Sequence, residues 1–136
     1  MSPFLVIRQH FIRRYDLRAN PSVRYIFGDN LAKTGYGGQA QEMRGEPNAY
    51  GISTKISPIE YARDIPEHLT LFTEAWDKEF EALLDTPEWR IFMDPVLIVF
   101  PLQGIGKGLA DMPTHAPLLW AILKKRLETS LGLRDL

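Results

Sequence analysis

The sequence contains no cysteine, and this absence excludes several kinds of site. Without a thiol there is no disulfide, no thiolate metal ligand and no cysteine nucleophile. A chain without disulfides fits a reducing compartment. The three histidines, His10, His68 and His115, stand far apart and show no metal-ligand spacing. We therefore expect each histidine to be a surface or packing residue, and we expect no metal and no cofactor.

Long apolar runs and an excess of charge of one sign are also missing. No segment is apolar over a length that could cross a bilayer, and the N-terminus lacks the apolar region of a signal peptide. The formal net charge is -1, so nothing indicates a broad nucleic-acid-binding or membrane-binding surface. We expect a soluble, cytoplasmic protein, and the length of 136 residues predicts a single domain over residues 1–136.

The most informative stretch begins with the apolar run Val96–Phe100. Because it has no polar alternation, it predicts a strand covered on both faces, as in parallel sheets. Gly104, Gly106 and Gly108 follow at every second position, where the missing Cβ lets the backbone bend tightly and approach a ligand. With a helix expected just beyond, after Thr114, the stretch predicts a phosphate site. Its spacing matches neither the Walker motif nor the dinucleotide fingerprint, so a glycine-rich turn without a ligand is the alternative.

The same order of elements occurs earlier in the chain. A strand expected at Val23–Phe27 leads to the turn signal Gly28-Asp29-Asn30 and a loop over residues 31–36. Gly37-Gly38 then enter a short helix that reaches Arg44. Two such units on neighbouring parallel strands would close over one diphosphate from both sides. This doubling favours a ligand site over two unrelated turns.

Other segments complete an alternating pattern. Strands are expected over residues 4–7 and 49–55, and helices over residues 15–20, 68–84 and after Thr114, which should cap the last helix with Pro117 in its first turn. Apolar residues at helical spacing predict the buried stripes of the two long helices: Leu69, Phe72, Trp76, Phe80 and Leu83 in one, and Leu119, Leu123, Leu127 and Leu131 in the other. Strands alternating with helices predict a three-layer α/β fold.

The order of these motifs resembles that of the macro domain, the ADP-ribose-binding α/β fold. In that family a strand ending in an Asn-containing turn leads to a glycine loop and a helix, as in Phe27–Asn30 followed by Gly35–Ala40. A later strand ending in Phe-Pro precedes a second glycine loop, as Phe100-Pro101 precede residues 104–110 here. The resemblance spans roughly residues 12–131. It implies a three-layer α/β/α macro-domain-like fold with a mixed, largely parallel central sheet.

The Gly-x-Gly-Leu-Ala form of the second loop is most similar to one branch of the family. This branch contains terminal ADP-ribose glycohydrolase and the antitoxins that remove ADP-ribose from DNA. There, an early Asp-Leu pair contacts adenine, as Asp16–Leu17 would, and a strand ending in Thr-Lys supplies the catalytic lysine, as Thr54–Lys55 would. The catalytic aspartate of that branch directly follows Gly-Leu, whereas Ala110 holds that place here and Asp111 comes next. Small phage and bacterial proteins with a Gly-Asp-Asn, Gly-Gly-Gln-Ala, Arg-Gly-Glu-Pro-Asn pattern are also similar.

The resemblance implies a hydrolytic role for three residues. Lys55 would attack the anomeric carbon, Asp111 would act as general acid or base, and Asp29 would activate a water. ADP-ribose would be held by backbone and side-chain groups of Asp16, Leu17, Asn30, Gly35, Gly37, Gly38, Gln39, Gly104, Ile105, Gly106, Lys107 and Gly108. Tyr36 or Phe100 would stack on a ring or wall the ribose, and the polar cluster of Arg44, Glu46 and Asn48 would line the distal pocket.

Each of these residues also has an ordinary structural interpretation. Asp16 could cap a helix or a turn, and Asp111 could cap a turn. Asn30 could form a turn, and Lys55 could be an exposed lysine at a strand end. Three hypotheses follow: a hydrolase that removes ADP-ribose from protein or nucleic acid, a module that reads or sequesters ADP-ribose or a related nucleotide signal, and an interaction protein whose glycine loops are only turns. We expect no membrane partner, and the sequence does not indicate the oligomeric state.

Overall fold

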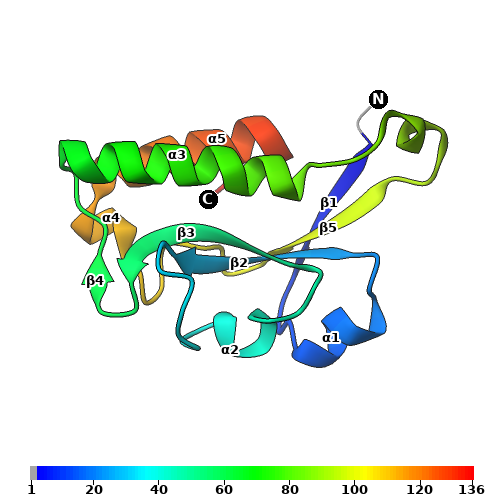
Figure 1. The fold of residues 1–136 in the computed structure, drawn as a ribbon, viewed down its shortest axis with the longest axis horizontal. Coiled ribbons are helices and arrows are strands. Elements are labelled where there is room, and N and C mark those ends of the chain that lie inside the picture. The colour runs from blue at the N-terminus through cyan, green and yellow to red at the C-terminus, as the bar shows by residue number, and fades with distance from the viewer. Residues whose placement is uncertain (1–2) are drawn as a thin grey trace.

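The computed structural model describes residues 3–136, and for Ile91 and Phe92 it describes the backbone only. Within this range no helix has both the length and the apolar character of a membrane span. The elements run along the chain as β1 (Phe4–Gln9), α1 (Arg14–Ala19), β2 (Arg24–Asn30), α2 (Ala40–Met43), β3 (Ala49–Ser57), β4 (Glu60–Tyr61), α3 (Pro66–Leu83), a 3₁₀ helix (Glu88–Phe92), β5 (Val96–Pro101), α4 (Met112–His115) and α5 (Pro117–Leu131) (Figure 1).

The strands form one five-stranded sheet in the order β1-β5-β2-β3-β4. The first four are parallel to their neighbours, and the two-residue β4 runs antiparallel to β3. Helices α3 and α5 cover one face of the sheet, and the short helices α1 and α2 cover the other (Figure 1). The expectation of a three-layer α/β fold with a mixed, largely parallel sheet is confirmed.

The strand β5 lies between two hydrophobic cores. Ile98 and Phe100 belong to the larger core, which α3 and α5 build with side chains such as Trp76 and Leu119. Val99 belongs to the smaller core beneath α1 and α2. Because successive side chains of a strand point to opposite faces, an unbroken apolar run is what a strand covered on both faces requires.

One strand boundary and one buried stripe differ from the sequence-based expectation. Gly28-Asp29-Asn30, expected to be a turn, continue β2, because all three residues still pair with β3. In α3 the buried stripe includes His68 in place of Leu69, which is 38% exposed. The imidazole of His68 is useful in this buried position because its Nδ1 accepts a hydrogen bond from the backbone N–H of Arg63 at 2.9 Å.

The helix expected after Thr114 is divided in two. Thr114 lies inside the single turn of α4, and α5 begins at Pro117. The first N–H groups of α5 donate to the carboxylate of Asp64, at 2.8 Å from Leu118 and 2.9 Å from Leu119. The positive end of α5 is therefore occupied by a distant side chain, and it does not serve the second glycine loop as the sequence suggested.

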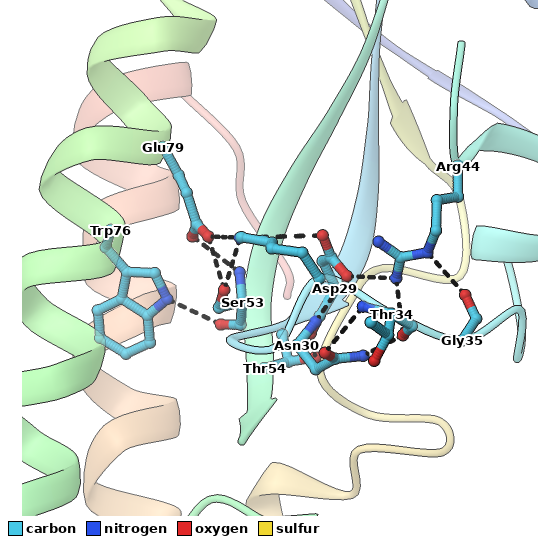
Figure 2. Close-up of polar contacts among 10 residues, drawn as sticks. Asp29, Asn30, Thr34, Gly35, Arg44, Ser53, Thr54, Trp76 and Glu79 are labelled. Carbon is cyan, nitrogen blue, oxygen red and sulfur yellow. Dashed lines mark hydrogen bonds and ion pairs between the residues drawn. The ribbon is translucent and has the colours of Figure 1, made fainter. Parts of the chain in front are cut away.

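Helix α3 also protects the outer edge of β3 beyond the short β4. Trp76 Nε1 donates to the carbonyl of Ser53 at 2.8 Å, and Glu79 Oε1 accepts from the backbone N–H of Ser53 at 2.8 Å (Figure 2). These side chains bond to backbone groups of β3 that a neighbouring strand would otherwise pair with. Unpaired groups at a sheet edge can pair with another chain, and these bonds prevent that at Ser53.

Candidate functional site

A cleft of about 470 Å³ lies at the carboxyl ends of β2, β3 and β5. One wall is the first glycine loop (residues 31–39), which follows β2, and the other is the second glycine loop (residues 102–111), which follows β5. Gly37 and Gly106 therefore border the same cleft. Open parallel sheets commonly bind ligands at the carboxyl ends of their strands. The structure thus brings together the two loops that the sequence predicts to cooperate.

The two loops also touch each other through Leu109. Its Cδ1 would lie 3.0 Å from a Cβ added to Gly37 and 3.8 Å from one added to Gly38. Leu109 itself is 67% exposed. The glycine pair of the first loop therefore leaves room for an apolar side chain of the second, at the mouth of the cleft.

Backbone N–H groups supply many free donors to the cleft. In the described part of the chain, the N–H groups of residues 35–39 and 105–110 donate to no protein acceptor. Gly104 and Gly106 adopt φ values of +81° and +83°, which glycine reaches without steric cost. Successive N–H groups in such turns form concave sites that bind anions. Because α2 and α4 have only four residues each, these loops rather than a long helix would hold an anion.

The side chains of the cleft carry an excess of positive charge. Arg44, Lys55 and Lys107 line it, whereas Asp29 is the one carboxylate among the described lining residues. The side chain of Asp29 is 4% exposed and contacts Arg44 Nη2 through Oδ1 at 2.5 Å. Lys33 Nζ lies 3.8 Å from Oδ2 of the same carboxylate. Both oxygens of Asp29 thus face cations, which leaves them poorly placed to activate a water.

Lys55 lies in the cleft, held by the hairpin that joins β3 to β4. Its Nζ donates to the carbonyl of Pro58 at 2.7 Å and lies 4.7 Å from the centroid of the Tyr61 ring. The ring of His115 stacks on that of Tyr61 at a centroid distance of 3.8 Å. A carbonyl oxygen and an aromatic face are both good partners of an ammonium ion.

Three of the sequence-predicted residues lie outside the described lining of the cleft. Asp111 has φ of +41°, precedes α4 and places Oδ2 4.0 Å from His115 Nε2. Asp16 caps α1, since its Oδ2 accepts from the backbone N–H of Arg13 at 2.8 Å and from Gln9 Nε2 at 3.2 Å. Leu17 is buried in the smaller core. None of Asp111, Asp16 and Leu17 is among the described residues that line the cleft.

Asn30 lines the cleft, but its side-chain amide forms hydrogen bonds with the first glycine loop. Its Nδ2 donates to the carbonyl of Thr34 at 2.7 Å, and its Oδ1 accepts from the N–H of Thr34 at 3.4 Å. This is the turn-forming role that the sequence left open for Asn30. The other first-loop residues predicted to bind, Gly35, Gly37, Gly38 and Gln39, and the second-loop residues Gly104, Ile105, Gly106, Lys107 and Gly108, all line the cleft.

Only one residue of the expected polar cluster and one of the two aromatic residues line the cleft. Arg44 and Tyr36 line the cleft, whereas Phe100 is buried in the larger core. Glu46 pairs with Arg14 and Arg18, and the hydrogen bond from Arg18, supported by Arg14, lowers the pKa of the Glu46 carboxyl. Asn48 Nδ2 lies 3.0 Å from each of three carbonyls, those of Leu17, Asn20 and Val23. Glu46 and Asn48 therefore fasten α1 to the rest of the protein.

Pro58, Gln103 and Leu109 line the cleft although the sequence did not single them out. Pro58 comes from the turn before β4, a two-residue strand in a segment that reads as irregular. No sequence signal could place it there. Leu109 stands in the Gly-Leu-Ala segment of the second loop, and that motif was the available signal.

Comparison with known proteins gives one informative match. Neither the curated proteins nor the solved structures contain a match to the chain. The model of a family described as "Family of unknown function (DUF7831)" matches residues 7–126. This range contains both glycine loops, Lys55 and Arg44. The chain therefore belongs to the DUF7831 family.

Proposed function

We propose that the protein binds ADP-ribose in the cleft and hydrolyses ADP-ribosyl linkages on protein or nucleic acid. The observation that carries this proposal is that two glycine loops, from separate strand–helix units, line one cleft. Their unpaired N–H groups and the surrounding Arg44, Lys55 and Lys107 suit a pyrophosphate group, which carries about two negative charges.

In the proposed complex, the loops would hold the two phosphates. The N–H groups of Gly37 and Gly38 would donate to one phosphate, and those of Ile105, Gly106 and Lys107 to the other. A cleft of about 470 Å³ is within the size range of sites that enclose a small ligand. The distal ribose would then lie toward Lys55, the reactive side chain that the resemblance to the glycohydrolase branch indicates.

For hydrolysis, the Lys55 ammonium would first have to give a proton to solvent, since its contacts with the Pro58 carbonyl and the Tyr61 ring suit the charged form. The nitrogen forms a bond to the anomeric carbon of the distal ribose while the bond to the protein or nucleic-acid atom breaks and that atom keeps the electron pair. The leaving atom takes up the proton that the new amine adduct releases. Water then cleaves the adduct, which frees ADP-ribose and restores the lysine.

Calorimetry and thermal unfolding with ADP-ribose, NAD, AMP and ADP test the binding. A ligand at a hundred times its Kd should add about 2.7 kcal/mol to the free energy of unfolding. ADP-ribose should bind best, and AMP should bind weakly because it offers a single phosphate. If none of these nucleotides changes the melting temperature, the glycine loops are only turns.

Lys55→Ala tests the hydrolysis. This variant should no longer release ADP-ribose from a modified protein or oligonucleotide but should still bind it, and full activity of this variant would remove Lys55 from the mechanism.

A binding module without turnover is the second candidate. The positions of the two candidate catalytic carboxylates favour it. Asp29 is paired with cations, and Asp111 does not line the cleft. No other carboxylate is among the described residues that line it. This candidate predicts tight binding of ADP-ribose with no release from any modified macromolecule, in the wild-type protein as in Lys55→Ala.

A further inference from the structure

The first glycine loop is tied down by Arg44, a residue that stands at the end of α2. Its Nε donates to the carbonyl of Gly35 at 2.6 Å, and its Nη2 donates to the carbonyl of Thr34 at 3.1 Å (Figure 2). The same Nη2 meets Asp29 Oδ1 at 2.5 Å. One planar guanidinium thus joins two consecutive carbonyls of the loop to a carboxylate at the end of β2.

These contacts fix the direction of the neighbouring N–H groups. In a trans peptide, the N–H points opposite to the C=O of the same unit. With the carbonyls of Thr34 and Gly35 turned toward Arg44, the N–H groups of Gly35 and Tyr36 point away from it. Neither N–H donates to an acceptor within residues 3–136, and both residues line the cleft. Arg44, together with Asn30 Nδ2 at the Thr34 carbonyl, therefore occupies the acceptors of this segment and leaves its donors free.

Asp29 also anchors the beginning of the loop. Lys33, in the left-handed region with φ of +58°, places its ammonium between Asp29 and α3, where it contacts Ser53 Oγ at 3.1 Å and pairs with Glu79. Glu79 in turn holds the backbone of β3 (Figure 2). The buried carboxylate of Asp29 thus contacts two cations, Lys33 and Arg44, and Glu79 supplies the second negative charge.

We propose that Arg44, anchored on Asp29, is a positioning residue that holds the first glycine loop in the shape that receives an anionic ligand. The inference rests on the proposed function for the identity of that ligand, ADP-ribose, but the ordering of the loop does not depend on it. The role requires a guanidinium, because only a planar fork with several N–H groups reaches two carbonyls and a carboxylate at once. A lysine at this position would keep a positive charge beside Asp29 but would lose the hydrogen bonds to the carbonyls of Thr34 and Gly35.

The test compares Arg44→Lys with Arg126→Lys. Arg126 is the matched control, since its Nη1 lies 2.6 Å from Asp77 Oδ1 on helices away from the cleft. In the ligand-free protein, backbone order parameters from NMR relaxation should fall for residues 34–38 in Arg44→Lys and stay unchanged in Arg126→Lys. The Kd for ADP-ribose should rise about tenfold in Arg44→Lys only, as expected for lost hydrogen bonds of a charged group.

Chemical rescue separates positioning from general support of the fold. In Arg44→Ala, millimolar guanidinium should restore the loop order and the ADP-ribose affinity, whereas methylammonium should not. If circular dichroism shows that Arg44→Ala is unfolded, Arg44→Gln is measured in its place.

Three further outcomes are decisive. Unchanged loop order in Arg44→Lys overturns the inference, whether or not affinity falls. Equal rescue by methylammonium also overturns it, because charge alone would then suffice. Loss of loop order in a protein whose wild type binds no ADP-ribose supports the positioning role and removes the proposed function.

Discussion

Gly51 leaves the space in which the side chain of Asp29 lies. A Cβ added to Gly51 would lie 2.5 Å from Oδ2 and 2.8 Å from Cβ of Asp29. The two residues stand on neighbouring parallel strands, with Gly51 paired to Phe27 and Asp29 paired to Ser53. A glycine outside the cleft lining therefore permits the buried carboxylate on which Arg44 and Lys33 converge.

The first prediction concerns this contact. Gly51→Ala should lower the free energy of unfolding by about 1–3 kcal/mol, because the new methyl group overpacks a buried site. It should also weaken ADP-ribose binding, since Asp29 must move away from Arg44. Urea unfolding and calorimetry measure the two effects.

A double-mutant cycle provides the control for Gly51→Ala. Asp29→Gly removes all the Asp29 atoms that the new methyl group would meet, Oδ2, Cγ and Cβ, so Gly51→Ala should cost less in that background than in the wild type. Equal costs in both backgrounds would show that the two residues do not compete for space.

The second prediction contrasts two glycines of the second loop. Gly106 has φ of +83°, and a Cβ there would lie 2.9 Å from Cζ3 of Trp120 and 3.2 Å from Sδ of Met112. A Cβ added to Gly108 would have no neighbour within 4 Å. Gly106→Ala should therefore destabilise the protein by about 1–3 kcal/mol and reduce ligand affinity. Gly108→Ala should change the free energy of unfolding by less than about 0.5 kcal/mol. A similar loss in both variants in urea unfolding would contradict this assignment.

The larger elements were predictable from the sequence because each rests on a local pattern. The buried run Val96–Phe100 and the stripe Leu119, Leu123, Leu127 and Leu131 keep the periodicity of a strand and a helix, and the structure confirms both. The cap of α5 was not predictable, because Asp64 lies 54 residues from Leu118 in the sequence. The short β4 carries no pattern of its own, since two residues have no periodicity.

For the candidate site, the sequence predicted the positions of the two backbone loops but not the roles of the side chains. The glycine spacing of both loops indicated where the chain turns, and parallel strands bring such turns to one edge of the sheet. The side-chain roles depend on tertiary contacts that the sequence does not display. Arg44 reaches Asp29 across 15 residues, and Lys33 reaches Glu79 across 46. Asp16 differs, because its cap of α1 is a contact across three residues, and this was the ordinary structural role that the sequence left open for it.

The third prediction separates fold support from ligand binding. Asn48→Ala should lower the free energy of unfolding by about 1–3 kcal/mol, because it leaves the buried carbonyl of Leu17 and the part-buried carbonyl of Val23 without this donor. Ligand affinity should stay the same, since Asn48 is not among the described residues that line the cleft. Asn20→Ala is the control, because its exposed amide bonds to the carbonyl of Asp16 and to the hydroxyl of Tyr25, and that carbonyl keeps the backbone N–H of Asn20 as a donor. Loss of ADP-ribose affinity in Asn48→Ala at a temperature where the variant is folded would contradict this separation.

The fourth prediction is a dependence on alkaline pH. Burial raises the pKa of the Tyr25 hydroxyl above its ordinary value of 10.0, with a further contribution from Asp16. Because the folded protein holds this proton more tightly than the unfolded chain, the stabilisation is fully present below the unfolded pKa and is lost as pH rises through the folded pKa. Between about pH 9 and pH 11, urea unfolding should show a steeper loss of stability for the wild type than for Tyr25→Phe. Tyr15→Phe is the control, since Tyr15 is 77% exposed and its variant should follow the wild-type curve. If the curves of the wild type and Tyr25→Phe run parallel over this range, burial of Tyr25 does not govern the alkaline limit of the fold.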